Sequence, residues 1–309
     1  MNKQAKKIIV LGSLNVDTTQ HIEKLPEQGR TIHINDLTNS PGGKGANQAV
    51  AAARQGAKVI FIGAVGNDNN GEFMKKTLAD NGIDTSYIVQ KPAATGSATI
   101  LLEKDGNNTI LVYGGANMQL SPEDVLPVEK EISQADAIVA QFETPIETTI
   151  AAFQIAKKHH VMTILNPAPA RTIAPKLLAL SDFVTPNETE AEALTGRKVS
   201  FQLDSLEKTA DDFDKLGVKN TIITLGSHGS FYRVNGKSGL IPSFKADAVD
   251  TTAAGDTFIG AFAANLDSDL DNLTESLVWA SKSASLTVRR LGALESIPVF
   301  EEVEKAFRK

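Results

Sequence analysis

A short stretch near residue 255 combines small residues with an acid in a way that suits phosphate chemistry. Ala253, Ala254 and Gly255 precede Asp256 at the entrance of a small-residue helix predicted over 258–265. Small residues let backbone N–H groups approach a ligand closely, and a helix N-terminus concentrates unpaired N–H donors and partial positive charge, which suits an anion. Asp256 is able either to cap this helix or to take the proton from a hydroxyl that attacks a phosphate held by those N–H groups. The stretch by itself leaves both interpretations open.

A second glycine-rich stretch, 40–47, reads Ser-Pro-Gly-Gly-Lys-Gly-Ala-Asn and precedes an alanine-rich helix predicted over 48–54. Glycine permits close backbone approach and positive φ. The stretch is not a Walker A loop, because its glycine spacing differs and no Ser or Thr follows Lys44. A glycine-rich entry to a helix is the structural alternative. We favour a ligand loop, because Lys44 and Asn47 stand among residues without bulk.

Two polar pairs follow predicted strands. Asn15 and Asp17 come directly after the buried strand 8–12, and ligands in open α/β sheets lie beside such strand ends. Both side chains offer hydrogen bonds suited to a polyol, and the alternative is an ordinary turn. Asn187 and Glu190 stand three residues apart at a helix start, where they could hold Mg²⁺ through waters beside phosphates or form a capping box.

A glycine turn at 226–229 follows the predicted buried strand 221–225. Its sequence, Gly-Ser-His-Gly, leaves backbone N–H groups free, which suits a nucleotide. No G-x-G-x-x-G follows the first predicted strand, so a dinucleotide-binding fold is not expected.

The composition argues against several classes of function. The chain has 309 residues, a net charge of −6 and no cysteine. Mild acidity without a basic stripe argues against nucleic-acid binding, and the lack of cysteine excludes disulfides and thiolate metal sites. The adjacent His159 and His160 are expected to end a solvated helix rather than to bind a metal.

No apolar run approaches the roughly 20 residues that a transmembrane helix needs. The run 8–11 follows several lysines, but it is too short for the core of a signal peptide and Asp17 soon interrupts it. We therefore expect a soluble, cytoplasmic protein without a membrane partner or a nucleic-acid partner.

The order of apolar segments predicts an α/β fold. Unbroken apolar runs alternate with helical patterns, which is typical of a central, mostly parallel β-sheet flanked by helices. We expect one such domain over 1–309. The predicted strands are 8–12, 58–63, 137–141, 161–165, 183–185 and 221–225, with a hairpin over 231–241; the predicted helices are 48–54, 71–81, 146–159, 258–265, 272–286 and 299–307, with one more ending at Leu194.

A small β-sheet is predicted apart from this alternation. Residues 31–38 alternate polar and apolar side chains, and the segment 96–113 reads as two strands around a turn at 104–108. We expect these strands to form a lid inserted from about 15–40 and 95–115. Its apolar face needs cover, so a homodimer through the lid sheet is also expected.

Three motifs are specific in combination: Gly-Gly-Lys-Gly-Ala-Asn-Gln-Ala at 42–49, Asn-Glu-Thr-Glu at 187–190, and Asp-Thr-Thr-Ala-Ala-Gly-Asp-Thr-Phe at 250–258. Together they resemble the carbohydrate kinases of the ribokinase (PfkB) family, and the resemblance runs from about residue 8 to residue 307. Segments 12–17 and 166–171 are similar to those of the family members that phosphorylate ribose.

This resemblance implies a mostly parallel sheet flanked by helices, with a small β-lid that also forms a dimer interface. It implies transfer of the γ-phosphate of ATP to O5 of D-ribose, with Mg²⁺ required and K⁺ as an activator. Asp256 would be the base that accepts the sugar proton, and the N–H groups of Ala253, Ala254 and Gly255 would form an anion hole.

The resemblance also assigns residues to each ligand. The ribose site would comprise Asn15, Asp17, Gly43, Lys44, Gly45, Ala46, Asn47, Glu143 and Asp256. The ATP site would comprise Asn187, Thr224, Leu225, Gly226, Ser227, His228, Gly229, Gly255, Asp256 and Ser281. Asn187 and Glu190 would serve the Mg²⁺–phosphate region, and Asp250, Thr252, Thr287, Arg290, Gly292 and Ser296 would surround K⁺, several through backbone carbonyls.

Two positions depart from the pattern of the family. Ala253 replaces a common glycine, and we expect its φ to stay negative, where alanine is tolerated. Ser281 stands where a ring could stack on adenine, and a serine cannot stack.

Two other functions fit the same sequence. One is a kinase for another sugar or for a nucleoside, although Asn15, Asp17 and Lys44 favour a small polar sugar over a nucleoside base. The other is a non-catalytic sugar-binding or nucleotide-binding regulator on the same fold, against which the retained Asp256 counts.

Overall fold

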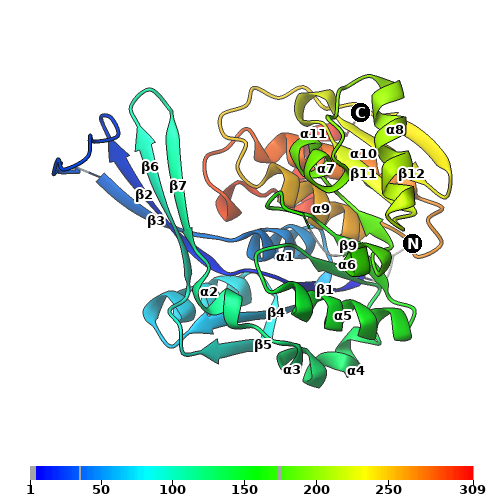
Figure 1. The fold of residues 1–309 in the computed structure, drawn as a ribbon, viewed down its shortest axis with the longest axis horizontal. Helices are drawn as coiled ribbons and strands as arrows, with labels where there is room; N and C mark the ends of the chain where they lie inside the picture. The colour runs from blue at the N-terminus through cyan, green and yellow to red at the C-terminus, as the bar shows by residue number, and fades with distance from the viewer. Residues whose placement is uncertain (1–4, 35, 173–174, 309) are drawn as a thin grey trace.

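The central sheet forms the middle layer of the molecule (Figure 1). The structure is a computed structural model that describes residues 5–34, 36–172 and 175–308. Within these residues the sheet is nine-stranded, in the order β13-β12-β11-β10-β9-β8-β1-β4-β5, and it is parallel except for β12 and β13. The expected mostly parallel sheet is therefore confirmed. The strands are β1 (Lys7–Leu11), β4 (Lys58–Gly66), β5 (Asp84–Lys91), β8 (Ala137–Ala140), β9 (Met162–Leu165), β10 (Phe183–Val184), β11 (Asn220–Thr224), β12 (Ser230–Val234) and β13 (Lys237–Ile241).

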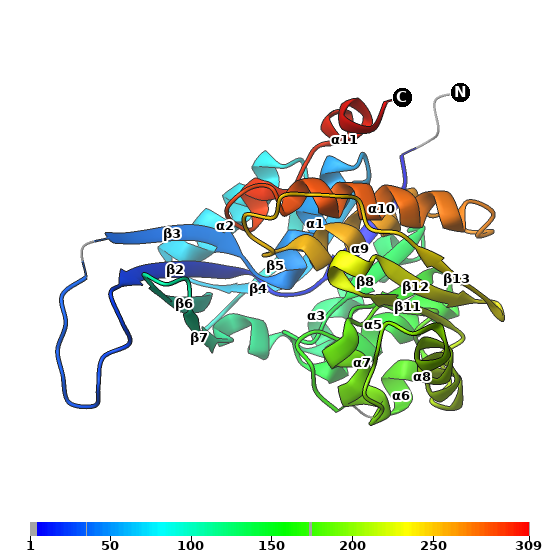
Figure 2. The ribbon, with the colours of Figure 1, turned by 90° about the horizontal axis from the view of Figure 1, so that it is seen from above.

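Helices cover both faces of this sheet, as Figure 2 shows from above. In β1 the side chains of Ile8 and Val10 enter one hydrophobic cluster, and those of Ile9 and Leu11 enter the other. A strand buried on both faces explains why β1 reads as an unbroken apolar run rather than an alternating one. One face packs against α1 (Lys44–Arg54), α2 (Asn69–Asp80), α9 (Ala254–Asn265) and α10 (Leu273–Thr287), with α11 (Phe300–Phe307) beside α10; the other packs against α3 (Pro122–Val125), α4 (Glu129–Ile132), α5 (Ile146–Lys158), α6 (Pro175–Ala179), α7 (Glu188–Thr195) and α8 (Leu203–Lys215).

A second, four-stranded sheet projects from one side of the molecule (Figure 1). Its order is β3-β2-β6-β7, with β2 parallel to β6 and the other pairs antiparallel. The small sheet expected from the sequence is therefore confirmed. Its strands are β2 (Asn15–Ile22), β3 (Asp36–Gly42), β6 (Gly96–Glu103) and β7 (Asn108–Tyr113).

The strand predicted over 31–38 is wrong in position. Residues 31–34 form no strand, residue 35 lies outside the described residues, and β3 begins at Asp36. Because proline has no N–H to donate, Pro41 argued against a strand that continues to Gly42. It is tolerated in β3 because β3 is an edge strand. The interpretation of Asn15 and Asp17 as turn residues is also wrong, because both belong to β2 and pair with Gly42 and Ser40.

Two glycine-rich stretches fold into first turns of helices rather than into loops. Helix α1 begins at Lys44 instead of residue 48, and α9 begins at Ala254 instead of residue 258. The sequence reading also missed β5 and α8. In α8 many charges obscured the helical spacing of the buried Leu206, Ala210 and Phe213.

Helices α1 and α9 touch at Gly260. A Cβ atom at this position would lie 2.5 Å from Ala51 Cβ and 2.5 Å from the Gln48 carbonyl oxygen. Only glycine allows so close a crossing. The crossing brings the first turn of α1 next to the first turn of α9.

His159 follows the last residue of α5, as expected, and its Nε2 atom lies 3.0 Å from Glu129 Oε1. Among the described residues, no helix is both long enough and apolar enough to cross a membrane.

Replacing Gly260 by Ala is expected to lower the free energy of unfolding by about 1–3 kcal/mol, because the new methyl group must displace tightly packed neighbours. Urea denaturation measures the change. Gly255→Ala is the matched control on the same helix, since a Cβ atom there meets nothing within 4 Å. Equal transition midpoints for the two variants would contradict the close α1–α9 contact.

Candidate active site

The candidate site lies at the carboxyl ends of the central strands. From β1 the chain proceeds to β4 and β5 on one side, whereas β8, β9 and β10 lie on the other side. A crevice between strands that lead in opposite directions is where open α/β sheets bind their ligands. The segments that leave β1, β8 and β9 carry Ser13, Glu143 and Asn166, and the first turns of α1 and α9 face them.

Asp256 is held by two amide side chains. Its Oδ2 accepts a hydrogen bond from Asn47 Nδ2 at 2.9 Å, and its Oδ1 accepts one from Gln48 Nε2 at 2.9 Å. The carboxylate is 8 % exposed and makes no capping bond to α9. The capping interpretation of Asp256 is therefore wrong. The geometry leaves this carboxylate buried and fixed in orientation by two amide donors.

The backbone that precedes Asp256 is accessible from outside the protein. Ala253 is the N-cap residue of α9, with φ +60°, so the expectation of a negative φ is wrong. The left-handed conformation costs a non-glycine residue roughly 1–2 kcal/mol. It turns the chain into the helix, where the Ala254 N–H donates to the Thr251 carbonyl oxygen at 3.3 Å, whereas the Gly255 and Asp256 N–H groups have no acceptor among the described residues. A Cβ atom at Gly255 would meet nothing within 4 Å, so the backbone of the proposed anion hole is accessible.

The end of β1 and the start of α1 are in backbone contact. A Cβ atom at Gly45 would lie 2.5 Å from the Ser13 nitrogen, and one at Gly43, where φ is +94°, would lie 2.9 Å from the Ser13 carbonyl oxygen. Glu143 Oε2 accepts hydrogen bonds from Ser13 Oγ and, at 3.1 Å, from the Lys44 backbone N–H. These contacts fix the Glu143 carboxylate at the entrance of α1.

Asn15 and Asp17 reach the same region from β2. Asn15 Oδ1 accepts a hydrogen bond from Asn117 Nδ2 at 2.8 Å, which fixes the orientation of the Asn15 amide. The carboxylate of Asp17 lies directly over Gly42, where a Cβ atom would be 2.2 Å from Asp17 Oδ2. The second sheet therefore contributes polar side chains to the candidate site.

Lys44 is the cation at the centre of an acidic environment. The Asp256 carboxylate, and to a lesser degree Glu143 and Glu190, raise the pKa of Lys44 although its burial acts in the opposite direction. Burial raises the pKa of Glu190, whereas the Asn187 backbone and Lys44 oppose that rise. Burial, with the nearby charges of Glu143 and Glu295, raises the pKa of Asp17 to about 6.

Asn187 and Glu190 form a capping box at the start of α7. Asn187 Oδ1 accepts from the Glu190 backbone N–H at 2.8 Å, and Glu190 Oε2 accepts from the Asn187 N–H at 2.9 Å. The second oxygen of Glu190 accepts from Asn187 Nδ2 at 3.1 Å. In the described part of the chain, no group of three or more His, Cys, Asp or Glu residues is placed to hold a metal ion. A metal at this position would therefore be held mainly through waters and phosphates.

The predicted nucleotide residues lie at the end of β11. Thr224 pairs with Asn187 through an isolated bridge, which joins this strand end to the capping box. Gly226, Ser227 and His228 form an exposed turn of 3₁₀ helix, whereas Leu225 is buried. The His228 ring stacks on Phe201 with 3.7 Å between ring centroids, a neighbour that the sequence reading missed.

Ser281 lies on α10 and is only 8 % exposed. Within the described residues no hydrogen bond joins it to the 226–229 turn.

The six residues assigned to K⁺ lie before α9 and around the end of α10. Asp250 and Thr252 precede α9, Thr287 is the last residue of α10, and Arg290, Gly292 and Ser296 follow it. Asp250 Oδ1 accepts from the Thr252 N–H at 2.9 Å, and Asp250 Oδ2 accepts from the Gly292 N–H at 3.0 Å. The Arg290 guanidinium instead donates to Glu302 Oε1 at 2.7 Å. The Thr287 hydroxyl is within hydrogen-bond distance of Thr257 Oγ1 and the Ser283 carbonyl oxygen, and the Ser296 hydroxyl donates to the Ala293 carbonyl oxygen.

Sequence reasoning missed Ser13, Gln48, Gln141 and Asn166, which the structure places in the hydrogen-bond network around Asp256 and Glu143. Gln48 directly follows the predicted Asn47, and Gln141 and Asn166 end predicted strands. Polar residues at the ends of buried strands were the signal that could have found them.

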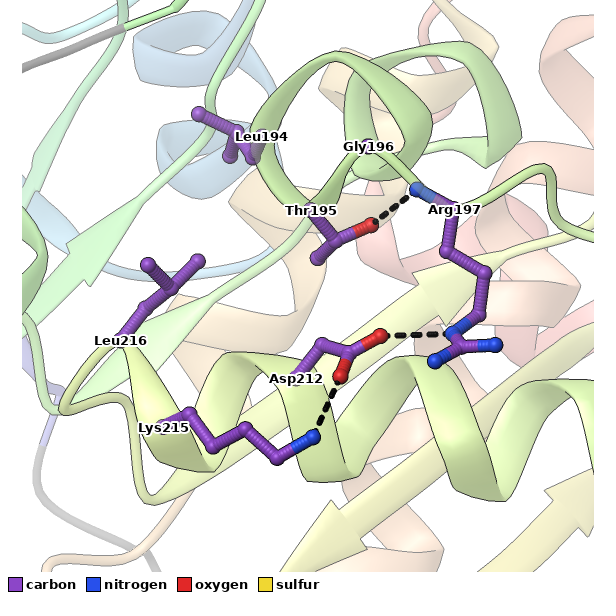
Figure 3. A pocket seen from close by; sticks show the side chains of 7 residues that line it. All are labelled: Leu194, Thr195, Gly196, Arg197, Asp212, Lys215 and Leu216. Atoms are coloured by element: carbon purple, nitrogen blue, oxygen red, sulfur yellow. Dashed lines mark hydrogen bonds and ion pairs between the residues drawn. The ribbon is translucent and has the colours of Figure 1, made fainter.

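A surface pocket away from this site lies between the end of α7 and α8 (Figure 3). Helix α7 leads away from the carboxyl ends of the strands, so its last turn is remote from its capping box. Asp212 in this pocket is already paired with Arg197 at 2.6 Å and with Lys215 at 2.8 Å. These pairs satisfy its carboxylate, and the pocket offers no group for chemistry.

Similarity to known proteins extends over nearly the whole chain. Residues 5–299 match the family model described as pfkB family carbohydrate kinase. The chain is 46 % identical to a ribokinase of Staphylococcus aureus (97 % of this chain, 99 % of the relative) and 43 % identical to a ribokinase of Haemophilus influenzae (96 % and 97 %). It also resembles the solved structure of an Arabidopsis thaliana ribokinase complexed with ribose and ATP, with a TM-score of 0.93, 34 % identity and coverage of 99 % of this chain and 100 % of that one.

Asp17→Asn is expected to stabilise the ligand-free protein by about 1–3 kcal/mol at pH 7. The raised pKa lets the folded protein hold the Asp17 proton up to about pH 6, whereas the unfolded chain releases it near the ordinary aspartate pKa of 3.8. The ionised carboxylate therefore costs stability as the pH rises from about 4 to 6, and the cost remains above that range.

Urea denaturation at pH 4 and at pH 7 measures this difference. Asp36→Asn on the neighbouring strand β3 is the control, because the Asp36 side chain is 65 % exposed. A gain of the same size at both pH values would exclude the buried charge as its cause.

Proposed function

Because the chain belongs to the pfkB family of carbohydrate kinases, we propose that it transfers the γ-phosphate of ATP to O5 of D-ribose. The products are ADP and D-ribose 5-phosphate. The observation that carries the proposal is the pair of amide hydrogen bonds that orients the Asp256 carboxylate beside the open first turn of α9. The relatives named ribokinase, which match nearly the whole chain, support ribose as the acceptor.

In the proposed step Asp256 accepts the proton of the ribose O5 hydroxyl. O5 forms a bond to the γ-phosphorus, and the bond between that phosphorus and the bridging oxygen breaks, with its electron pair leaving on ADP. The N–H groups of Ala253, Ala254 and Gly255 would stabilise the charge on the transferring phosphoryl group. A positioned base typically contributes about 10²–10⁴-fold to the rate.

The proposed ribose site has unused hydrogen-bonding groups. Asn47 Oδ1 is buried and has no hydrogen-bond partner within the described residues, so a sugar hydroxyl is a suitable donor to it. Asp17 and Glu143 would accept further hydroxyl protons, and Lys44 would donate. Because Asn15 and Asp17 belong to β2, the second sheet would serve as a lid that moves onto the sugar.

The residues also suit the ions that the family implies. The capping box leaves Asn187 and Glu190 able to orient metal-bound waters, and Mg²⁺ held there would neutralise phosphate charge. Asp250 joins the loops at 252 and 292, so carbonyls of both loops and the Asp250 charge would serve a monovalent cation. The exposed 226–229 turn would face the nucleotide.

An assay that couples ADP release to NADH oxidation tests the proposal with ribose, 2-deoxyribose, fructose and adenosine. Ribose is expected to give the highest kcat/KM in Mg²⁺ and K⁺, with a lower rate when Na⁺ replaces K⁺. Asp256→Asn is expected to lower kcat by about 10²–10⁴-fold while ribose binding, measured by calorimetry, persists.

The same assay separates the alternatives. A preference for fructose or adenosine would assign the chain to another kinase of the family. Binding of ribose without turnover by the unaltered protein would indicate a regulator. Near-normal turnover by Asp256→Asn would remove Asp256 as the base.

We also propose a homodimer through the second sheet. Edge strand β7 exposes a continuous apolar run, with Ile110, Leu111, Val112 and Tyr113 each more than half exposed. Leu37 on the other edge strand is 49 % exposed. An edge strand that is apolar on both faces needs cover to avoid aggregation. A second copy of the same sheet provides that cover symmetrically.

The double variant Leu111→Glu/Val112→Glu is expected to convert a dimer into a monomer, because it places charges on both faces of β7. Light scattering coupled to size-exclusion chromatography measures the mass. Leu240→Glu is the control, since Leu240 is 52 % exposed but lies on β13. A monomeric unaltered protein would exclude the interface.

A further inference from the structure

Gln48 uses its whole amide group in hydrogen bonds around Asp256. Its Nε2 donates to Asp256 Oδ1 at 2.9 Å and to Asn166 Oδ1 at 3.0 Å. Its Oε1 accepts from Gln141 Nε2 at 2.7 Å. Gln48 is 1 % exposed, so water is not a competing partner.

Asp256 and Asn166 determine which end of the Gln48 amide faces them, because the carboxylate only accepts and Asn166 uses its Nδ2 on the Thr185 carbonyl, which leaves Asn166 Oδ1 facing Gln48. If the amide were rotated by 180°, Gln48 Oε1 would face two oxygen atoms and its Nε2 would face the Gln141 donor. The contacts with the two oxygen atoms would be repulsive and unpaired in a buried site, whereas Gln141, whose Oε1 has no partner among the described residues, could rotate its own amide. Asn166, fixed by its bond to the Thr185 carbonyl, thus keeps the donor of Gln48 directed at the carboxylate.

The network ties the carboxylate to the rigid sheet. Gln141 follows β8, and Asn166 follows β9 and donates from Nδ2 to the Thr185 carbonyl at 3.1 Å. Within the described residues, the side chain of Gln48 therefore connects these strand-end residues to Asp256 through hydrogen bonds. Asn47, the second hydrogen-bond donor to Asp256, belongs to the proposed sugar contacts. Gln48 is therefore the donor that does not contact the substrate in the proposed complex.

We propose that Gln48 is the positioning residue of the phosphoryl transfer: oriented by Asn166 and supported by Gln141, it holds the Asp256 carboxylate in the direction from which it accepts the sugar proton. This rests on the proposed function, in which Asp256 is the base. Gln48 does not touch the reacting atoms, and its effect passes through Asp256.

Substitutions at Gln48 change few other charges. The charged groups that face Asp256 are Lys44 on α1 and Glu190 on α7, and Glu143 acts on Lys44. None of these carboxylates is hydrogen-bonded to Gln48 within the described residues. A Gln48 substitution therefore leaves the hydrogen bonds of these charged groups in place.

The first experiment compares Gln48→Met with Gln55→Met. Methionine keeps the volume and length of glutamine but donates no hydrogen bond. Gln55 is a matched control on the same helix, because it is 4 % exposed and its amide is bonded to Pro298 O at 2.8 Å and to Trp279 Nε1 at 2.9 Å, away from Asp256. Both variants lose buried amide hydrogen bonds.

Gln48→Met is expected to lower kcat by about 10- to 100-fold with little change in the KM for ribose. The acidic limb of its kcat–pH profile is expected to move to higher pH by about one unit, because the ionised Asp256 carboxylate loses a hydrogen-bond donor. Gln55→Met is expected to lose comparable stability without either change. If Gln48→Met does not fold, Gln48→Glu, which keeps the shape, is expected to shift the same limb upward through like-charge repulsion.

A double-mutant cycle with Gln141→Met tests the supporting bond from Gln141 to Gln48. If Gln141 acts only through Gln48, the double variant is expected to lose no more kcat than Gln48→Met alone. Independent losses would contradict the relay. The inference is overturned if the unaltered protein is active, Asp256→Asn is inactive, and Gln48→Met resembles Gln55→Met in both kcat and pH profile. If Asp256→Asn itself stays active, the proposed function fails instead.

Discussion

The contact between α1 and α9 at Gly260 is the constraint on which the site depends. It holds the first turns of two helices side by side, and both helix ends carry partial positive charge. Asn47 and Gln48 on one turn then reach Asp256 on the other at 2.9 Å. A buried carboxylate is costly unless it is paired and hydrogen-bonded, and these two amides meet that cost where two helix ends favour negative charge.

Several carboxylates lie close together in the candidate site. Asp256, Glu143 and Glu190 approach one lysine from different elements, and Asp17 carries a pKa raised to about 6. Such an arrangement lowers the stability of the ligand-free protein and leaves carboxylates available to the hydroxyl groups of the proposed sugar. Buried acids with perturbed pKa values cluster at functional sites for this reason.

The second sheet connects the candidate site with an exposed surface outside the main fold. Its strand β2 supplies Asn15 and Asp17, while its edge strand β7 exposes apolar side chains. Register links the two ends, because Asp17 pairs with Ala98 and Ala98 pairs with Val112 across neighbouring strands. The same rigid element therefore contacts the proposed sugar and the proposed partner copy.

The sequence by itself determined the fold class, most strands of the main sheet and the motifs around Lys44, Asn187 and Asp256. These features are local: unbroken apolar runs, glycine clusters and short spacings act through neighbours along the chain. Only the tertiary structure decided that the glycine-rich stretches are first turns of helices, that Ala253 has positive φ and that β2 exists. It alone showed Gln48 beside Asp256, because these residues are separated by 208 positions and are joined by the crossing of two helices. A pattern within one segment does not specify such a contact, since the packing of the whole chain creates it.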